Sequence, residues 1–259
     1  MTARLPTRPD APPAAHFRTF DGRRIGYRDE GDGPPVLLLH GIMSDGAWAW
    51  FGPGHAARLV ANGRRVIAPD FRGHSSSDAP REDSAYAGEA IVRDVEALLA
   101  ELGVVDPDVA GYSLGARMAI RWMVRGAKPG RAVLGGVGDS LVLGSPLLGV
   151  ERFERILATE GRSGRPDDAA AWAWMAHGGF DPRTMLALVR GLVATDPAQL
   201  ASIDVPALVV IGSDDTTVGS AERLASLMPR ASLRTIAGDH VQAGLSAAFG
   251  DALVEFICT

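Results

Sequence analysis

The chain has 259 residues, 46% of them hydrophobic, and a formal net charge of −5 at pH 7. This length is enough for one α/β domain with a single large core, and the acidic balance without a basic stripe argues against a nucleic-acid partner. The single cysteine, Cys258, excludes an intrachain disulfide, and no apolar run approaches the roughly 18 residues of a membrane-spanning helix.

The first residues are predicted to stand apart from the fold. Residues 1–15 carry arginines and four prolines but lack the apolar stretch of a signal peptide, so we expect a mobile tail and a cytoplasmic protein. The segment from His16 to Asp29, with Asp21-Gly22 at its middle, then predicts a hairpin that begins a sheet.

Further along the chain, short apolar runs alternate with stretches of helical pattern. The predicted strands are residues 36–39, 65–68, 107–110, 131–136, 206–211 and 231–236. The predicted helices are residues 46–61, 86–102, 116–123, 219–228 and 241–257. Repeated strand and helix units of this kind predict a mostly parallel, twisted sheet of about eight strands with helices on both faces.

The alternation is interrupted by residues 140–203, a stretch too long for a simple connection. It contains three helical patterns, at residues 148–160, 167–177 and 182–194. We therefore expect a helical insertion between two parts of one core, residues 16–139 and 204–259.

The most informative motif is Gly111-Tyr112-Ser113-Leu114-Gly115, a G-x-S-x-G pattern between a predicted strand and a predicted helix. The glycines allow neighbouring backbone to approach where a Cβ would clash, so the serine is held at the apex of a tight turn with its hydroxyl exposed. This context predicts that Ser113 is a nucleophile.

A serine hydroxyl needs a base to take its proton and a carboxylate to orient that base. His240 follows the predicted strand 231–236, and both Asp214 and Asp215 follow the strand 206–211. Two other acids are alternatives: Asp139, after the strand that follows the serine, and Asp239. Because neighbouring side chains rarely point at one another, Asp239 is interpreted as a loop residue.

Two further motifs complete a resemblance. The segment Leu37-Leu38-Leu39-His40-Gly41-Ile42 and the run Asp70-Phe71-Arg72-Gly73-His74 occur in the order in which the α/β-hydrolase superfamily carries such segments. From about residue 16 onward the chain resembles that superfamily, in particular its serine esterase and lactonase branch with a short cap. It departs at Ser75, where relatives usually carry glycine, and at Asp239, inserted between Gly238 and His240.

The resemblance implies the α/β-hydrolase fold, with residues 140–203 as a small helical cap. The family spacing favours Asp215 as the acid, so the implied triad is Ser113, Asp215 and His240. The oxyanion hole would be the backbone N–H groups of Ile42 and Leu114. Candidate pocket residues are His40, which we expect to be chiefly a structural hydrogen-bonding residue, and Tyr112, Trp172, Trp174, Met175 and Phe180.

The implied activity is hydrolysis of a small carboxylic ester or lactone through an acyl-enzyme. The expected partner is a small molecule with an activated carbonyl, and no metal or organic cofactor is expected. Alternatives are a carbon–carbon bond hydrolase of a vinylogous diketone, a cofactor-free perhydrolase, or, in a different class, a non-hydrolytic cyclase or a ligand-binding receptor. The serine argues against haloalkane dehalogenases and epoxide hydrolases, which by resemblance use aspartate at this position. The oligomeric state is not predicted.

Overall fold

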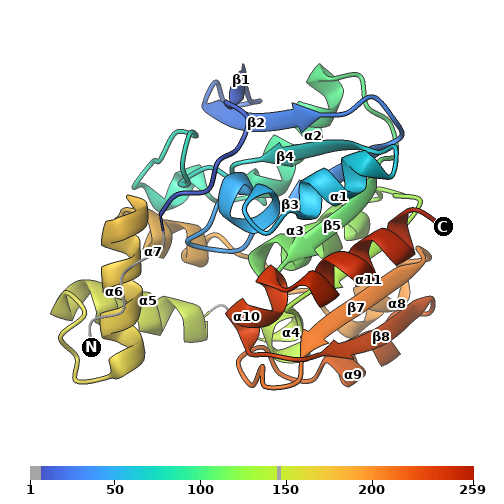
Figure 1. The fold of residues 1–259 in the computed structure, drawn as a ribbon. Coiled ribbons are helices and arrows are strands. Elements are labelled where there is room, and N and C mark those ends of the chain that lie inside the picture. The colour runs from blue at the N-terminus through green and yellow to red at the C-terminus, as the bar shows by residue number, and fades with distance from the viewer. Residues whose placement is uncertain (1–6, 145–146) are drawn as a thin grey trace.

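The computed structural model describes residues 7–144 and 147–259. Within these residues eight strands form one sheet in the order β1-β2-β4-β3-β5-β6-β7-β8 (Figure 1). The strands are β1 (Ala15–Arg18), β2 (Arg24–Glu30), β3 (Pro35–Leu39), β4 (Arg65–Pro69), β5 (Asp108–Tyr112), β6 (Ala132–Gly135), β7 (Ala207–Gly212) and β8 (Ala231–Ile236). The β1–β2 and β2–β4 pairs are antiparallel and the other pairs are parallel, which confirms the predicted mostly parallel sheet.

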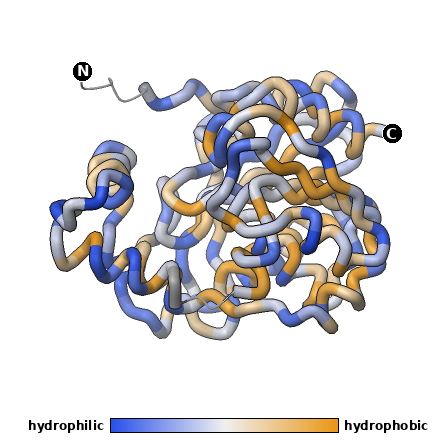
Figure 2. Tube along the Cα trace, turned by 90° about the horizontal axis from the view of Figure 1, so that it is seen from below, coloured by the Kyte–Doolittle hydropathy of each residue, from blue (hydrophilic) through white to orange (hydrophobic). Residues whose placement is uncertain are grey.

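The central strands are apolar throughout because helices cover both of their faces. Alternate residues of β3 point to opposite sides: Val36 and Leu38 join one hydrophobic core, and Leu37 and Leu39 join the other. The first core packs against α1 (His55–Ala61) and α11 (Ala247–Ile257), and the second packs against α2 (Ala90–Glu101), α3 (Leu114–Val124) and α9 (Ala221–Ser226). The hydropathy-coloured trace shows the apolar segments gathered inside this body (Figure 2).

Two helices predicted as continuous are divided in the structure. The predicted helix 46–61 consists of a π-helical turn, η1 (Ala47–Phe51), followed by α1, because Gly54 lies in the left-handed region at φ 80°. The predicted helix 241–257 consists of α10 (His240–Leu245) and α11. Ser246 separates them, since its extended backbone ends α10 while its hydroxyl accepts the Phe249 N–H at 3.1 Å. His240 therefore begins a short helix of its own.

The start of the predicted helix 86–102 also shifts. A 3-10 turn, η2 (Asp83–Ala85), precedes it, and α2 begins only at Ala90, because Glu89 is held in the left-handed region at φ 59°. The carboxylate of Glu89 pairs with Arg121 of α3, which ties the start of α2 to the neighbouring helix.

The insertion between β6 and β7 contains five helices in its described part. They are α4 (Asp139–Leu143), α5 (Leu147–Thr159), α6 (Pro166–Gly178), α7 (Pro182–Arg190) and α8 (Pro197–Ala201). Helix α4 packs on α9 and helix α8 on α3, whereas α5, α6 and α7 form a lobe beside the body (Figure 1). Residues 145–146, which the predicted cap includes, lie outside the described residues.

The first residues of the predicted tail, 1–6, also lie outside the described residues. The part that is described contacts the body. Arg8 donates to the buried carboxylate of Asp45 at 2.5 Å and to the hydroxyl of Ser75 at 2.8 Å, and Arg28 donates to the carbonyl of Pro12 at 3.0 Å. Arg8 is thereby attached to the loops that follow β3 and β4, and Pro12 is attached to β2.

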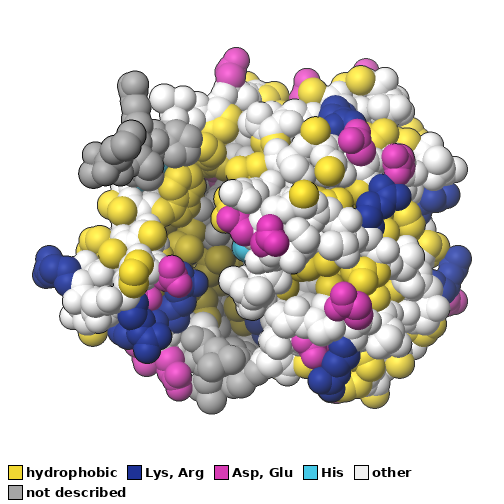
Figure 3. Space-filling view, turned by 60° about the horizontal axis from the view of Figure 1, so that its bottom comes forward, with side chains coloured by type: hydrophobic (Ala, Val, Ile, Leu, Met, Phe, Trp, Pro, Cys, Tyr) yellow, Lys and Arg dark blue, Asp and Glu magenta, His cyan; other side chains and the backbone are white. Residues whose placement is uncertain are grey.

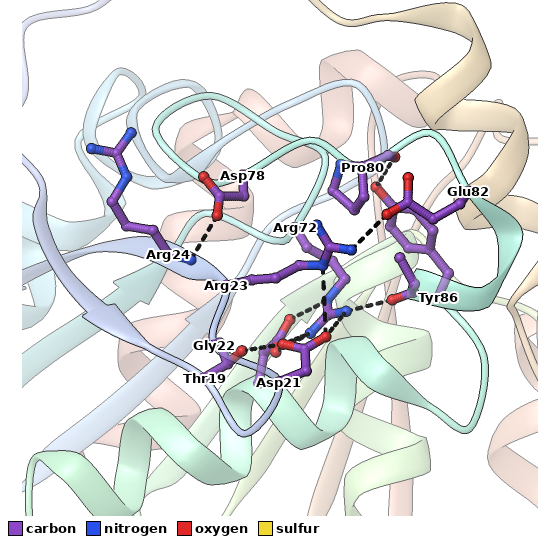
Figure 4. A network of polar contacts seen from close by, with 12 residues as sticks. Thr19, Asp21, Gly22, Arg23, Arg24, Arg72, Asp78, Pro80, Glu82 and Tyr86 are labelled. Atoms are coloured by element: carbon purple, nitrogen blue, oxygen red, sulfur yellow. Dashed lines mark hydrogen bonds and ion pairs between the residues drawn. The ribbon is translucent and has the colours of Figure 1, made fainter.

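The Asp-x-Arg-Gly-His motif holds loops together. Arg72 has no exposed surface, and its guanidinium binds the carboxylates of Asp94 in α2 and Asp21 in the hairpin turn (Figure 4). Asp70 accepts from Arg28 at 3.0 Å. Ser75, the departure from the family motif, has φ 45°, so it adopts the conformation that suits the glycine of relatives.

Candidate active site

Ser113 lies in the tight turn between β5 and α3, in a conformation that serine rarely adopts. Its φ is 55° and its ψ is −114°. The flanking glycines make the turn possible: a Cβ on Gly111 would lie 2.4 Å from the carbonyl oxygen of Gly115, and one on Gly115 would lie 1.9 Å from that of Leu39. Strain of this kind persists only where close packing enforces it, and here it points the hydroxyl away from the sheet.

A continuous hydrogen-bond chain connects Ser113 to an acid through a histidine. Nε2 of His240 lies 3.0 Å from Oγ of Ser113, and Nδ1 of His240 lies 2.6 Å from Oδ2 of Asp215. A carboxylate can only accept, so Nδ1–H donates to Asp215 and leaves Nε2 free to accept from the serine hydroxyl. The three residues follow β5, β7 and β8, whose carboxyl ends meet at the same edge of the sheet.

Asp215 is suited to remain ionised. Its side chain has no exposed surface, while that of His240 is 26% exposed. Burial raises the pKa of Asp215, but hydrogen bonds from the hydroxyl and N–H of Thr217, together with His240, outweigh burial and hold the pKa below its ordinary value. The site therefore pairs a buried anion with a partly exposed imidazole.

The other three acids have different contacts. Asp139, the first residue of α4, accepts the Ser220 N–H at 2.7 Å and forms an ion pair with Arg223 of α9. Asp239 is the N-cap of α10, where its carboxylate accepts the N–H groups of the second and third residues after it. Asp214 is exposed. In the described part of the chain, none of these three acids has a hydrogen bond to the His240 side chain, whereas Asp215 does.

Two side chains hold α10, the helix that His240 begins. The hydroxyl of Tyr112 donates to the carbonyl of His240 at 2.7 Å, and the ring of Tyr112 stacks edge-on against Phe249. Nε2 of His55 lies 2.9 Å from the carbonyl of Gly244. The pocket-lining role expected of Tyr112 stays a prediction; in the structure its ring contacts the rings of His240 and Phe249.

The burial of His55 leads to a prediction about stability and pH. His55 is 1% exposed, and burial holds its pKa below the ordinary value of 6.5. The unfolded chain then binds a proton at this residue below about pH 6.5 while the folded chain does not, so its contribution to stability is complete above that pH and is lost as the pH falls.

Replacing His55 with Gln removes the titrating group but keeps an N–H that can reach Gly244. We expect the free energy of unfolding of H55Q, measured by urea denaturation, to depend less steeply on pH between about 6.5 and 5, by up to about 1.4 kcal/mol per pH unit. Parallel curves for H55Q and the wild type would contradict this assignment.

The turn after β3 lies directly beside the serine. A Cβ on Gly41 would be 3.5 Å from the Cβ of Ser113. The N–H groups of Ile42 and Leu114 donate to no acceptor within the described residues, as expected of groups that would receive an oxyanion.

His40 fixes this turn from within the core. Nε2 of His40 accepts the Phe71 N–H at 2.9 Å, so Nδ1 carries the proton and donates to the Gly41 carbonyl at 2.7 Å. His40 has no exposed surface, and burial lowers its pKa, which keeps the ring neutral. These are the contacts of a structural hydrogen-bonding residue, and without exposed surface the His40 side chain offers no contact to a substrate in this conformation.

The predicted pocket residues of the insertion differ in position. Met175 is 0% exposed and Phe180 is 4% exposed, so both belong to the interior, and the half-buried Trp172 packs against the same core. Trp174 alone among them reaches the loop next to the serine, where its indole Nε1–H donates to the carbonyl of Met43 at 2.8 Å. A hollow between the lobe and the body has hydrophobic side chains along its walls and a histidine at its edge (Figure 3).

Met43, in the loop after β3, has no motif signal of its own, although its partner His74 belongs to the Asp-x-Arg-Gly-His motif. Met43 has φ 54°, and its N–H donates to Nε2 of His74 at 3.1 Å. The histidine of the Asp-x-Arg-Gly-His motif is the signal that could have pointed to this contact. Burial, together with repulsion from His40, lowers the pKa of His74 to about 3, so the ring is a neutral acceptor.

The described residues contain neither a cluster of metal ligands nor a helix able to span a membrane. Their histidine, cysteine and acidic side chains form no group of three or more that could hold a metal ion. In the same residues, no helix combines the length and apolar character needed to cross a bilayer.

Comparison with known proteins gives matches of several kinds. Residues 34–131 match the family described as alpha/beta hydrolase fold. An uncharacterized protein of Mycobacterium tuberculosis is 40% identical over 117 residues, which are 45% of this chain and 33% of that protein. The 2-hydroxy-6-oxo-6-phenylhexa-2,4-dienoate hydrolase of Burkholderia cepacia is 32% identical over 145 residues, 52% of this chain and 48% of that enzyme. The matched segments thus span a third to a half of these relatives.

Solved structures match nearly the whole chain. The esterase RhEst1 from Rhodococcus sp. is 26% identical with a TM-score of 0.73, and the match covers 95% of this chain and 98% of that structure. The architecture described above is therefore shared with that esterase along almost its full length.

Proposed function

We propose that this chain, which matches the alpha/beta hydrolase fold family over residues 34–131, is a serine hydrolase that cleaves a small carboxylic ester or lactone through an acyl-enzyme. The observation that carries the proposal is the hydrogen-bond chain from Ser113 through His240 to Asp215. A buried carboxylate, an imidazole with a free acceptor nitrogen and a hydroxyl at 3.0 Å are the components that this chemistry needs.

In the proposed reaction, Ser113 Oγ attacks the substrate carbonyl while Nε2 of His240 accepts the hydroxyl proton. The imidazolium is stabilised by Asp215, and the N–H groups of Ile42 and Leu114 hold the negative oxygen of the tetrahedral intermediate. His240 then donates the proton to the leaving alcohol oxygen, and the acyl group stays on Ser113. Water repeats the sequence, which releases the acid and restores the serine.

The hollow between the lobe and the body favours a largely apolar substrate. Hydrophobic side chains line its walls (Figure 3). We propose that the insertion, residues 140–203, acts as a cap, with the lobe of α5, α6 and α7 excluding water from the acyl-enzyme.

A second candidate is hydrolysis of a carbon–carbon bond in a vinylogous diketone. It is favoured by the similarity to the Burkholderia cepacia dienoate hydrolase, which covers about half of this chain. The same serine, base and oxyanion groups would serve, but the leaving group would be a carbanion that must be protonated on carbon.

The test combines turnover with covalent labelling. We expect the protein to hydrolyse p-nitrophenyl acetate and butyrate, and a fluorophosphonate probe to add one label, which mass spectrometry of peptides places on Ser113. A dienoate diketone serves as the competing substrate. Labelling of Ser113 with turnover of the diketone but not of esters or a lactone would favour the second candidate, and absence of label would exclude both.

A further inference from the structure

Met43, the residue after the proposed oxyanion donor Ile42, is held on both sides of its backbone. Its φ of 54° lies in the left-handed region, which a long side chain rarely adopts. Such a conformation persists only when its surroundings enforce it. Here the Met43 N–H donates to Nε2 of His74 at 3.1 Å, and the Met43 carbonyl accepts from Nε1 of Trp174 at 2.8 Å.

These two contacts come from different parts of the molecule. His74 belongs to the loop after β4 in the body, whereas Trp174 belongs to α6 in the lobe, 131 positions from Met43. The lobe also supports His74, because the ring of Phe180, just after α6, packs edge-on against it at 5.5 Å. Both hydrogen-bond partners of Met43 therefore depend on the position of the lobe.

The Ile42 N–H and the Gly41 carbonyl belong to one peptide plane, and Ile42 is bonded directly to Met43. Gly41 is fixed by His40 and packs against Ser113, so the turn is anchored at its start and held at Met43 at its end. A change in the conformation of Met43 would displace Ile42 against the fixed Gly41 carbonyl, and this would tilt the peptide plane that carries the Ile42 N–H. Oxyanion donors act at distances of about 2.7–3.1 Å, so a small rotation weakens them.

We propose that Trp174 is a positioning residue: its indole N–H holds the Met43 carbonyl and thereby aims the Ile42 N–H, so that the oxyanion hole is complete only when α6 is docked on the turn. This inference rests on the proposed function. It assigns Trp174 a role in the transition state, in contrast to a packing role or to the pocket-lining role expected from the sequence.

The structure offers a matched control for Trp174. The ring of Trp48, in η1, stacks edge-on against that of Trp174 at a centroid distance of 5.4 Å. Trp174→Phe removes the N–H donor and keeps an aromatic ring in the stack. Trp48→Phe alters the same stack and leaves the hydrogen bond to Met43 in place.

Two measurements on the wild type, W174F and W48F test the proposal. The first is amide hydrogen exchange of a peptide that contains residues 41–45, and the second is the steady-state kinetics of p-nitrophenyl butyrate hydrolysis. For W174F we expect exchange in this peptide to be about tenfold faster and kcat about tenfold lower, with KM changed less than about twofold, because the displaced donor acts mainly on the transition state. W48F should resemble the wild type in both measurements.

Several outcomes would overturn the proposal. Unchanged exchange in W174F would show that the indole does not hold the turn, and faster exchange with unchanged kcat would show that the turn does not depend on it for catalysis. Equal losses in W48F would assign the effect to ring packing. If the wild type hydrolysed no ester, the proposed function and the catalytic role of Trp174 would both be wrong, while exchange would still decide whether Trp174 holds Met43.

Discussion

Replacing Ser113 with Ala is expected to reduce kcat for ester hydrolysis by a factor on the order of 10⁶. The substitution removes only the hydroxyl group. In the proposed mechanism no other group can form the acyl-enzyme. His240 and Asp215 stay in place but have no proton to transfer, so the remaining rate would come from binding and the oxyanion N–H groups alone.

The fold of this variant should be unaffected. Alanine has the same Cβ as serine and fits the left-handed turn at φ 55° with similar strain, so we expect a melting temperature within a few degrees of the wild type. Circular dichroism and thermal unfolding check the fold, and single-turnover hydrolysis checks the activity. More than a few per cent of wild-type activity in a folded S113A protein would refute the acyl-enzyme mechanism.

Replacing Asp215 with Asn should have the second largest effect, a loss in kcat of about 10⁴. Asparagine keeps the size of the side chain but loses the charge that stabilises the imidazolium. Its amide can also donate to Nδ1 of His240, which moves the ring proton to Nε2 and blocks acceptance from Ser113. The buried position of Asp215 makes water a poor substitute for the lost carboxylate.

The other acids provide controls for D215N. Asp139→Asn, Asp214→Asn and Asp239→Asn should each lose about tenfold or less, because none of these carboxylates has a hydrogen bond to His240. Steady-state kinetics of the four variants, with thermal unfolding in parallel, makes the comparison. A dead D139N with an active D215N would transfer the acid role to Asp139.

The sheet could be predicted from the sequence because each strand is a short apolar run bounded by turn residues. For β3 and β7 the pattern is nearly continuous, since both faces are covered, and the observed strands begin and end within one residue of the prediction. The ends of the helices were harder to predict. The π-helical turn before Gly52 and the break at Ser246 depend on single backbone conformations that a helical pattern does not record.

For the candidate site, predictability followed the topology of the sheet and not the distance in sequence. Ser113, Asp215 and His240 each follow a strand, so topology alone brings them to one edge of the sheet. Tyr112 and His40 could not be placed by motif, because the direction of a side chain next to a strained turn is decided by packing partners such as Phe249 and Phe71. The contact between Trp174 and Met43 has no local signal, since it forms only when the lobe meets the body.

The order of the strands along the chain has a consequence for synthesis. The hydrogen bond from Ser113 to His240 joins residues 127 positions apart, and β7 and β8 must be added to the sheet before α10 can bring the imidazole to the serine. A chain that grows from its N-terminus therefore contains the turn of Ser113 well before it contains His240, the proposed base. In the proposed mechanism, Ser113 of the nascent polypeptide is an unactivated alcohol until the edge strand β8 joins the sheet and α10 brings His240 to it.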